Sequence, residues 1–564
     1  MLTKPLKHPF FFLLLLCLSS IQCRQNTQVV KTDTIMIRLA AEPEQVDPLL
    51  ARTLADRQLN NLLFLPLLDY DPQTLKLVPI LARTLPVVDS IKSGPWQGGI
   101  RYQFTIRPNA TWDNGTPVTA KDYIFTFKTL LNPGVNATPF RIYFNFLKDI
   151  VVDPNDPKKF SVYTDRPYTM ALEALGSIGL YPEYHYDANQ LIKNIPITDL
   201  TDTDRADSIY QNTIALQEFA EKFNNKNPHQ TIGGSAFEIT QWNTNQQIVL
   251  TKKKQHWTED IPSLQSFPDQ LIYKIIPDVN SALSLLYNQK LDVMTGIPPI
   301  QFESIKRELN ENYNFYTPQK LSYDYIGING NQSFLQEVNV RRALAHLVDV
   351  EQIISEIWNG QAERTIGPIH PAKSYYHQKL LPISFDPSQA NTLLNKSGFG
   401  VGKEQLQLRY FYNIKNEKAA EIGLLLKKAA RAINVEILPT GMEIKALLTA
   451  YRQRQYDLIY LTWTSPPGLD DLRQTWHSSS NVAGGSNRTG FGDKASDQLI
   501  DEIRISYNRR NQKELYLRIQ EIIYQNQPYI FLYTPLERMA IHHRFSMEPT
   551  PLYPGYKIGR FNLN

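Results

Sequence analysis

The chain has 564 residues, of which 42% are hydrophobic and 20% are charged. Such fractions are ordinary for a globular protein and exclude a disordered, collagen-like or polytopic membrane chain. With 59 Lys and Arg against 55 Asp and Glu, the formal net charge is only +4, which argues against nucleic acid as a partner.

The amino terminus predicts an exported protein. Lys4 and Lys7 precede an apolar run at residues 9–18, which is the order found in a secretory signal. The run is too short to span a bilayer, because a spanning helix needs about 20 apolar residues. We therefore predict a signal peptide at residues 1–22, and no later stretch is apolar enough to cross a membrane.

Cys23 follows the apolar run, as in bacterial lipoprotein signals. We predict that it carries a lipid anchor on a bacterial membrane, in the periplasm or at the cell surface, with residues 23–33 as a polar tether. Ser20 and Gln22 depart from the usual pattern before the cysteine, so simple cleavage and a retained anchor stay open as alternatives. After cleavage only Cys23 remains, which leaves no intramolecular disulfide.

Strand-like and helix-like patterns alternate along the mature chain, which predicts a mixed α/β class. "RYQFTIR" places Tyr102, Phe104 and Ile106 on one face of a strand. Thr119 in "DNGTPVTAKD" and Asp278 in "IIPDVNSALSLLYNQ" are expected to be the N-caps of helices.

A further helix is predicted in "DPSQANTLLNKSG". Asp386 is the expected N-cap, Pro387 occupies the first helical position and Gly398 lies beyond the last turn. In "NVRRALAHLVDVEQIISEIW", five apolar residues share one helical stripe, and core packing explains the stripe. These residues are Val340, Leu344, Leu347, Ile354 and Ile357.

The sequence contains no motif of catalysis or metal binding. It has neither a His-Glu-x-x-His pair nor a Gly-x-Ser-x-Gly elbow, and His542 and His543 would point to opposite faces of a strand. "GFGVGKE" fails as a phosphate loop, because Ser397 stands at the first glycine and Glu404 follows the lysine. We predict no enzyme, no cofactor and no metal site. An exported hydrolase is an alternative that turnover of a bound ligand would support.

Seven blocks occur in order along the mature chain. They are "WDNGTPVTAKDYIFTFKTLLNP", "GGSAFEITQWNTNQQIVLTKKKQHW", "LIYKIIPDVNSALSLLYNQKLDVM", "NVRRALAHLVD", "FDPSQANTLLNKSGFG", "GFGDKASDQLIDEI" and "IIYQNQPYIFLY". Together they resemble the family 5 extracytoplasmic solute-binding proteins of ABC transporters, the oligopeptide, dipeptide and nickel binding group.

This resemblance implies a two-lobed periplasmic-binding-protein clamshell of the α/β class, in the large three-subdomain form of type II, with a two-segment hinge. The chain would cross between the lobes near "YDYIGIN" and return near "PYIFLYT". The expected division is lobe I at 34–70, 191–318 and 528–564, an inserted subdomain of lobe I at 71–190, and lobe II at 319–527.

The implied function is that of the solute-binding lipoprotein of an ABC importer. A monomer would close its lobes on a peptide or peptide-like ligand and present the closed form to permease subunits. A non-peptide solute, such as an oligosaccharide or a chelated metal, is the alternative ligand. A receptor or sensor that presents its ligand to a signalling partner is the alternative function, and an adjacent pair of permease genes would favour transport.

The segment "WTSPPGLDD" is the expected ligand contact. In peptide-binding relatives, an aspartate shortly after the tryptophan pairs with the terminal ammonium of the ligand. When Trp463 is matched to that tryptophan, Pro466 stands where the aspartate would fall. Because an unpaired buried ammonium is costly, either Asp470 or Asp471 replaces the lost carboxylate or the ligand has no free amine. The alternative is that both aspartates cap the helix that follows.

Further ligand contacts are implied by the resemblance. Trp463 would form an apolar wall, or belong to the core, and the main chain from Thr462 to Ser465 would pair with an extended ligand by strand addition. Hinge structure alone explains Asn329 and Tyr533 equally well, because they lie at the two crossings. The predicted ligand-binding residues are Glu42, Asn329, Thr462, Trp463, Thr464, Ser465, Asp470, Asp471 and Tyr533.

Overall fold

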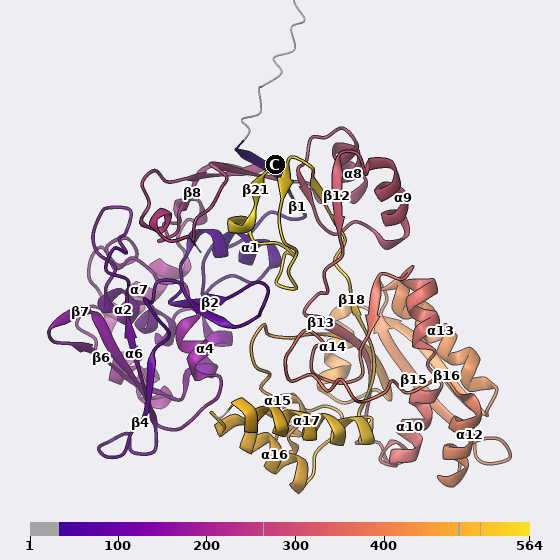
Figure 1. Cartoon of the computed structure of the whole chain (residues 1–564). Helices are drawn as coiled ribbons and strands as arrows, with labels where there is room; N and C mark the ends of the chain where they lie inside the picture. Colours follow the sequence, from indigo (N-terminus) through magenta and orange to yellow (C-terminus); the bar gives the residue numbers. More distant parts are fainter. Residues whose placement is uncertain (1–32, 263, 483–484, 508) are drawn as a thin grey trace, which may run out of the picture.

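The computed structural model describes residues 33–564, apart from 263, 483–484 and 508. Two bodies, each built on its own large sheet, make up this part of the chain (Figure 1). We call the body around the seven-stranded sheet lobe I and the body around the six-stranded sheet lobe II. The predicted signal peptide and the predicted lipid attachment at Cys23 lie outside the described residues.

Lobe I is built on a mixed sheet with helices on both faces. In spatial order its strands are β12 (Tyr313–Tyr316), β19 (Met539–His542), β11 (Val293–Met294), β1 (Thr34–Leu39), β10 (Gln270–Ile275), β9 (Gln247–Lys252) and β8 (Phe237–Asn243). The helices of this body are α1 (Leu54–Leu63), α8 (Val279–Tyr287) and α9 (Pro299–Leu309). β1 pairs in parallel with both β10 and β11. Two small sheets accompany it, β2 (Leu68–Tyr70) with β3 (Leu77–Pro79) and β20 (Phe545–Ser546) with β21 (Asn562–Leu563).

Lobe I also carries a subdomain on an antiparallel sheet. Its strands are, in spatial order, β4 (Val87–Ser90), β5 (Ile100–Thr105), β7 (Asp156–Thr164) and β6 (Leu147–Asp153). Its helices are α2 (Ala120–Leu131), α3 (Thr138–Arg141), α4 (Ala171–Gly176), α5 (Glu183–Tyr186), α6 (Thr203–Asn212) and α7 (Ile214–Asn224). Phe125 of α2 packs edge to face on Phe219 of α7, with ring centroids 5.8 Å apart. The subdomain therefore extends past the predicted boundary at residue 190.

Lobe II covers its sheet with helices on both faces. In spatial order the strands are β14 (Ala362–Arg364), β18 (Tyr529–Pro535), β13 (Ser322–Ile328), β17 (Leu458–Thr464), β15 (Leu406–Asn413) and β16 (Val435–Met442). One face carries α10 (Val338–His346), α11 (Val350–Gln352), α12 (Pro387–Lys396) and α13 (Glu417–Arg431). The other carries α14 (Ile444–Arg452), α15 (Arg473–Trp476), α16 (Lys494–Ile505) and α17 (Arg509–Asn526).

Each buried apolar cluster of the described residues belongs to one lobe alone. The largest joins the seven-stranded sheet to the four-stranded subdomain and includes Leu59, Phe104 and Tyr273. Because no apolar core is shared between the lobes, they can move relative to each other without breaking a core. The predicted two-lobed α/β fold is thus confirmed.

Two segments connect the lobes. Residues 317–321 lead from β12 to β13, and residues 536–538 lead from β18 to β19. β18 pairs with β13 and β14 within lobe II, which corrects the predicted return to lobe I at residue 528. The strand completes the sheet of lobe II before the chain crosses, so the return lies at 536–538.

The predicted helix caps are confirmed. The Thr119 side chain accepts a hydrogen bond from the Lys121 amide, and Asp278 and Asp386 cap α8 and α12 in the same manner. Gly398 follows α12 with φ +89°, a conformation that suits glycine after a helix. β5 alternates buried and half-buried residues as "RYQFTIR" predicts.

The apolar stripe predicted along one helix is divided between two. α10 ends at His346, and the Asp349 side chain accepts a hydrogen bond from the Gln352 amide to start α11. Because this local bond favours a new helix start, Ile354 and Ile357 fall in a separate π-helical segment, Ile353–Ile357.

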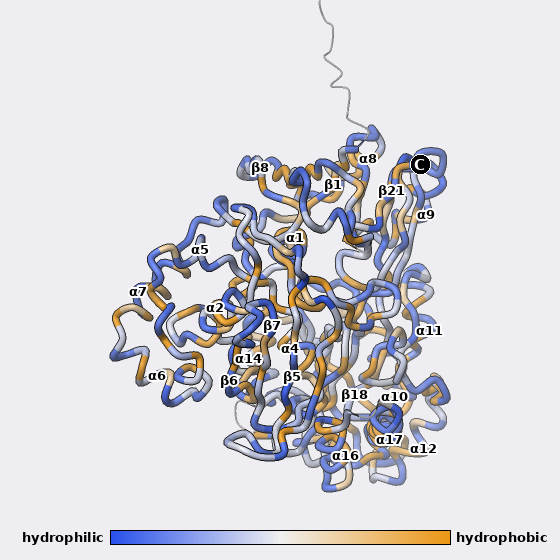
Figure 2. Tube along the Cα trace, turned by 60° about the vertical axis from the view of Figure 1, so that its left-hand side comes forward, coloured by the Kyte–Doolittle hydropathy of each residue, from blue (hydrophilic) through white to orange (hydrophobic). Residues whose placement is uncertain are grey.

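None of the described helices is long and apolar enough to cross a membrane. In the trace coloured by hydropathy, hydrophobic and hydrophilic segments alternate along the chain (Figure 2).

His370 ties lobe II to the first connecting segment. Its Nε2 lies 2.7 Å from the Lys320 carbonyl oxygen, and its Nδ1 accepts a hydrogen bond from the Ala372 amide at 3.1 Å. The residue is fully buried. Burial lowers the pKa of His370 from 6.5 to about 4, although the bond to Lys320 opposes the shift.

We expect acid to destabilise the fold through His370. Because its pKa is depressed in the folded state, its stabilisation is complete above about pH 6.5 and is lost as the pH falls to about 4. Protonation of His370 should by itself lower the free energy of unfolding by roughly 3 kcal/mol over this range. Denaturant titrations at several pH values would measure the loss, which should be smaller in His370→Gln. Equal losses in the two proteins would contradict this origin.

Candidate functional site

The carboxyl ends of parallel strands from the two lobes face each other across the hinge. β12 runs parallel to β11, since both are antiparallel to β19, and it leads directly towards lobe II. β17 is antiparallel to β13, so its carboxyl end returns towards lobe I together with that of the parallel β15. Ligands of open α/β sheets commonly bind outside the carboxyl ends of strands. The crevice between the lobes is therefore the candidate site.

β17 presents a partly unpaired edge in this crevice. On the side of β15, the pairing of β17 within the described residues is confined to Leu458 and Ile459. The Ser465 amide donates to the Leu321 carbonyl at 2.9 Å, so the main chain of Ser465 faces β13. Because main-chain groups alternate along an antiparallel strand, those of Thr462 and Thr464 face the opposite edge. The main-chain groups of Thr462 and Thr464 can therefore pair with an added strand. The Ser465 amide already donates to the Leu321 carbonyl, which corrects the prediction that Ser465 pairs with the ligand.

A buried polar network lies behind this edge. Thr462 Oγ1 and the Tyr460 hydroxyl donate to the two oxygens of Asp324 at 2.6 and 2.5 Å. The hydroxyls of Tyr460 and Tyr533 lie 2.8 Å apart. Burial raises the pKa of Asp324, although the bonds from Thr462 and Tyr460 oppose the shift. Tyr533 is fully buried, so it supports Asp324 from within lobe II.

Trp358 and two cations lie at the same end of lobe II. The ring of Trp358 meets that of Tyr533 edge to face at 5.3 Å. Lys418 Nζ lies 4.0 Å from the centroid of Trp358, and the Arg538 guanidinium carbon lies 6.0 Å from it. Cations at such distances are attracted to an indole ring. Arg538 is fixed mainly by its bonds to the Ile297 and Leu536 carbonyls, both at 2.6 Å.

Trp463 points to the other face of the sheet. It packs, partly buried, against the cluster that contains Tyr323, Leu472 and Phe531. The packed side of the Trp463 ring agrees with the alternative that this residue belongs to the core. That the exposed side forms an apolar wall for a ligand stays a prediction.

Asp470 is not available to a ligand amine. Its side chain is buried and Oδ2 accepts hydrogen bonds from Lys373 Nζ at 2.6 Å and from the Tyr375 hydroxyl at 2.9 Å. Burial raises the pKa of Asp470, which the Lys373 ammonium opposes. Burial also lowers the pKa of Lys373, which Asp470 opposes. Asp470 is therefore one half of a buried ion pair.

Asp471 is also engaged within the protein. Its Oδ1 accepts a hydrogen bond from the Arg473 amide at 3.0 Å and lies 3.4 Å from Arg504 Nε. Its Oδ2 accepts the Tyr168 hydroxyl at 3.2 Å. The bond to the Arg473 amide supports the alternative that an aspartate of this loop caps α15, although Leu472 is its N-cap residue.

The loop that carries both aspartates touches lobe I. A Cβ added at Gly468 would clash with the Tyr70 hydroxyl and with Glu173 Oε2. Burial raises the pKa of Glu173, which the Tyr70 hydroxyl, the Lys373 ammonium and the Leu469 amide oppose. Gly468 thus lets the loop lie directly on α4 and β2.

A second set of bonds joins the lobes beside this loop. The Thr169 amide donates to the Arg504 carbonyl at 2.7 Å, and the Tyr168 amide donates to the Tyr507 hydroxyl at 2.7 Å. Gln512 Nε2 donates to Thr169 Oγ1 at 2.5 Å. We call these bonds, with those of the 468–471 loop, the interlobe contact. It holds the lobes together on the side of α4, α16 and α17 (Figure 1).

Glu42 and Asn329 have structural partners. The Glu42 carboxylate accepts hydrogen bonds from Trp242 Nε1 at 2.6 Å and from the Asn245 amide at 3.0 Å. The Glu42 side chain therefore lies against the β8–β9 hairpin. Asn329 is fully buried, and its Nδ2 donates to the Arg454 and Tyr456 carbonyls at 2.8 Å. The contacts of Asn329 favour its structural interpretation, and the Glu42 carboxylate, predicted as a ligand contact, already has two partners within lobe I.

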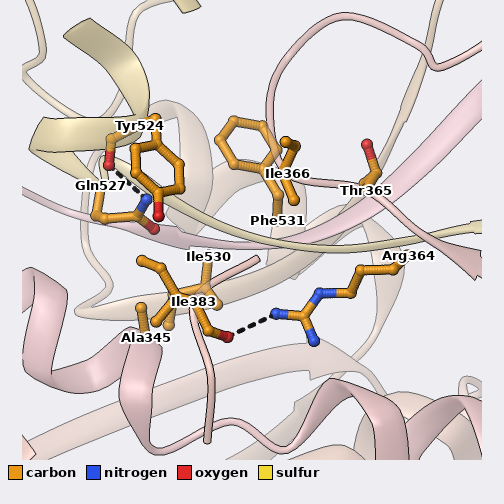
Figure 3. A pocket seen from close by; sticks show the side chains of 9 residues that line it. All are labelled: Ala345, Arg364, Thr365, Ile366, Ile383, Tyr524, Gln527, Ile530 and Phe531. Atoms are coloured by element: carbon orange, nitrogen blue, oxygen red, sulfur yellow. Dashed lines mark hydrogen bonds between the residues drawn. The ribbon is translucent and has the colours of Figure 1, made fainter. Parts of the chain in front are cut away.

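Two cavities lie outside the crevice. One of about 20 Å³ lies in lobe II between β14 and β18, where Arg364 donates to the Ile383 carbonyl at 2.9 Å (Figure 3). It has room for about one water molecule. The other, of about 310 Å³, is lined by the four-stranded subdomain and the segment after it, and its Lys226 already pairs with Asp47 at 2.9 Å. Within the described residues, no group of three His, Cys, Asp or Glu could hold a metal ion.

Several residues of this region were missed by sequence reasoning. Asp324 had a signal, because it is the only charged residue in the apolar strand "SYDYIGI". Lys373 and Glu173 had no such signal in the sequence. Lys373 contacts Asp470, and Glu173 contacts the loop that carries Asp470, and both contacts join residues that are far apart in the chain.

The fold of this chain is similar to the folds of several proteins with solved structures. The chain is similar to the oligopeptide-binding protein AppA from Bacillus subtilis in complex with a nonapeptide, with a TM-score of 0.67, 21% identity and coverage of 94% of this chain and 99% of that chain. It is also similar to HbpA2 from Haemophilus parasuis, with a TM-score of 0.75, 19% identity and coverage of 94% and 100%.

Sequence comparison agrees with the fold. The oligopeptide-binding protein AppA of Bacillus subtilis (strain 168) is 24% identical over 471 residues, which are 81% of this chain and 79% of the relative. The family model "Bacterial extracellular solute-binding proteins, family 5 Middle" matches residues 79–484. The chain belongs to family 5 of the bacterial extracellular solute-binding proteins.

Proposed function

We propose that this protein is the solute-binding component of an ABC importer and binds a peptide in extended conformation between its lobes. The observation that carries the proposal is the edge of β17 away from β13 at Thr462 and Thr464, which pairs with no other strand among the described residues. An edge strand binds a peptide through main-chain hydrogen bonds, and these bonds are common to all peptide sequences. Closure of the lobes then buries the ligand and makes the form that a permease accepts.

The relatives support a peptide ligand. AppA of Bacillus subtilis is an oligopeptide-binding protein, and its solved structure holds a nonapeptide. DppE of the same organism is a dipeptide-binding protein. The protein acts outside the cytoplasm, as the family description states.

Thr464→Pro should weaken the binding of a mixed pool of octapeptides about 10-fold, because proline removes the amide that faces the ligand edge. Trp463 is in strand conformation, which a following proline tolerates. Titration calorimetry would measure the affinity. Thr464→Val keeps the amide and serves as the control, with unchanged affinity expected. Equal affinities of both variants would contradict strand addition at this edge.

The lipid anchor is part of the proposal. The order of basic residues, apolar run and Cys23 supports it. In a bacterial host, the wild-type protein should incorporate labelled palmitate and remain with the membrane fraction. Cys23→Ser should do neither, and a labelled variant would contradict an anchor at this residue.

A further inference from the structure

Every acidic side chain at the 466–471 loop already has a partner from the protein. Asp470 holds Lys373 Nζ at 2.6 Å, and Asp471 lies near Arg504 and accepts the Tyr168 hydroxyl. Glu173 of lobe I is covered by Gly468. The loop therefore offers no free carboxylate to a ligand.

Lys373 supplies an ammonium of its own. Asp470 and Lys373 are only 5% exposed each, and the Tyr375 hydroxyl donates to the same carboxylate oxygen as Lys373. A second ammonium at Asp470 would have to displace a buried cation from a carboxylate that it already neutralises. Such an exchange leaves one buried cation without a partner, which is costly.

Glu173 is closed off on the side of the 466–471 loop. Its carboxylate lies so close to the Gly468 backbone that even a methyl group at Gly468 would clash with Oε2. A group placed between the loop and Glu173 Oε2 would therefore clash.

We propose that Lys373 replaces the α-amino group of a ligand in this protein, so that the site binds peptides without recognising their amino terminus. This inference rests on the proposed function and specifies its ligand class. Peptides with a blocked amino terminus, and longer peptides whose amino end continues past the 466–471 loop, bind as well as those with a free amine. Affinity comes from the main-chain contacts at β17, which any peptide sequence can make.

The test uses one pool of synthetic octapeptides of mixed sequence, prepared with free amino termini and again with acetylated ones. The purified full-length protein is incubated with each pool, and captured peptides are identified by native mass spectrometry. We expect the same sequences from both pools, with affinities that agree within about threefold. A preference of roughly 30-fold or more for free amines would overturn the inference while upholding peptide binding. Capture from neither pool would overturn both proposals.

The variant Lys373→Met tests whether Lys373 is the reason that both peptide pools bind equally. Lys373→Met leaves the Asp470 carboxylate without its cation, so this variant should prefer the free-amine pool by about 10-fold or more. Lys379→Met changes an exposed lysine six residues away and should bind both pools equally. A folded Lys373→Met protein without any preference would overturn the role of Lys373. If the variant does not fold, the comparison of the two pools with the wild-type protein still decides the inference.

Discussion

Replacing Lys373 with methionine should lower the free energy of unfolding by about 3–5 kcal/mol, because it leaves Asp470 charged and buried without a cation. The pair is shielded from water on both sides, and its 2.6 Å contact joins the 466–471 loop to the segment after β14. Denaturant titration at pH 7 would measure the loss. The loss should be smaller at pH 5, because a carboxyl group with a raised pKa in the folded state stabilises that state more as the pH falls.

The double variant Lys373→Met with Asp470→Leu distinguishes this cause from simple loss of packing. It removes both charges, and buried pairs replaced by apolar side chains are often neutral or more stable. We therefore expect most of the lost stability to return. A double variant as unstable as Lys373→Met alone would show that the charge on Asp470 is not the reason.

Gly468→Ala should open the lobes. The added methyl group would clash with Tyr70 and Glu173 across the interlobe contact, and overpacking of this kind costs about 1–3 kcal/mol. Because the clash exists only in the closed form, the ratio of closed to open protein should fall by roughly 10-fold. Small-angle X-ray scattering should then report a larger radius of gyration, and peptide affinity should decrease in parallel.

Gly367→Ala is the matched control. A Cβ at Gly367, also in lobe II, meets no atom within 4 Å, so the radius of gyration and the affinity should stay unchanged. If Gly468→Ala behaves like Gly367→Ala, the loop does not set the position of the lobes.

Local sequence signals predicted the local structure of this protein. Thr119 and Asp278 cap their helices because capping depends on a few neighbouring residues. The seven blocks predicted the two lobes. Local sequence signals could not predict the sheet to which β18 belongs. That sheet is determined by pairing partners such as β13, which is about 200 residues away in the chain.

The details of the site depend on long-range contacts. Lys373 and Asp470 are 97 residues apart, and nothing in "HPAKSYY" or "GLDD" shows that they meet. Asp470 therefore looked like a ligand anchor in the sequence, whereas it is the partner of an internal lysine. The main chain at Thr462 and Thr464 stays a predicted contact, with a free edge that supports it.

The proposed function requires that the ligand is a peptide. Native mass spectra of the mature protein, purified from its own host without its lipid anchor, would show what it carries, and the released ligand can be sequenced by fragmentation. We expect a ladder of peptide masses, including peptides with blocked amino termini. A single discrete mass from a non-peptide solute, such as an oligosaccharide or a chelated metal, would contradict it.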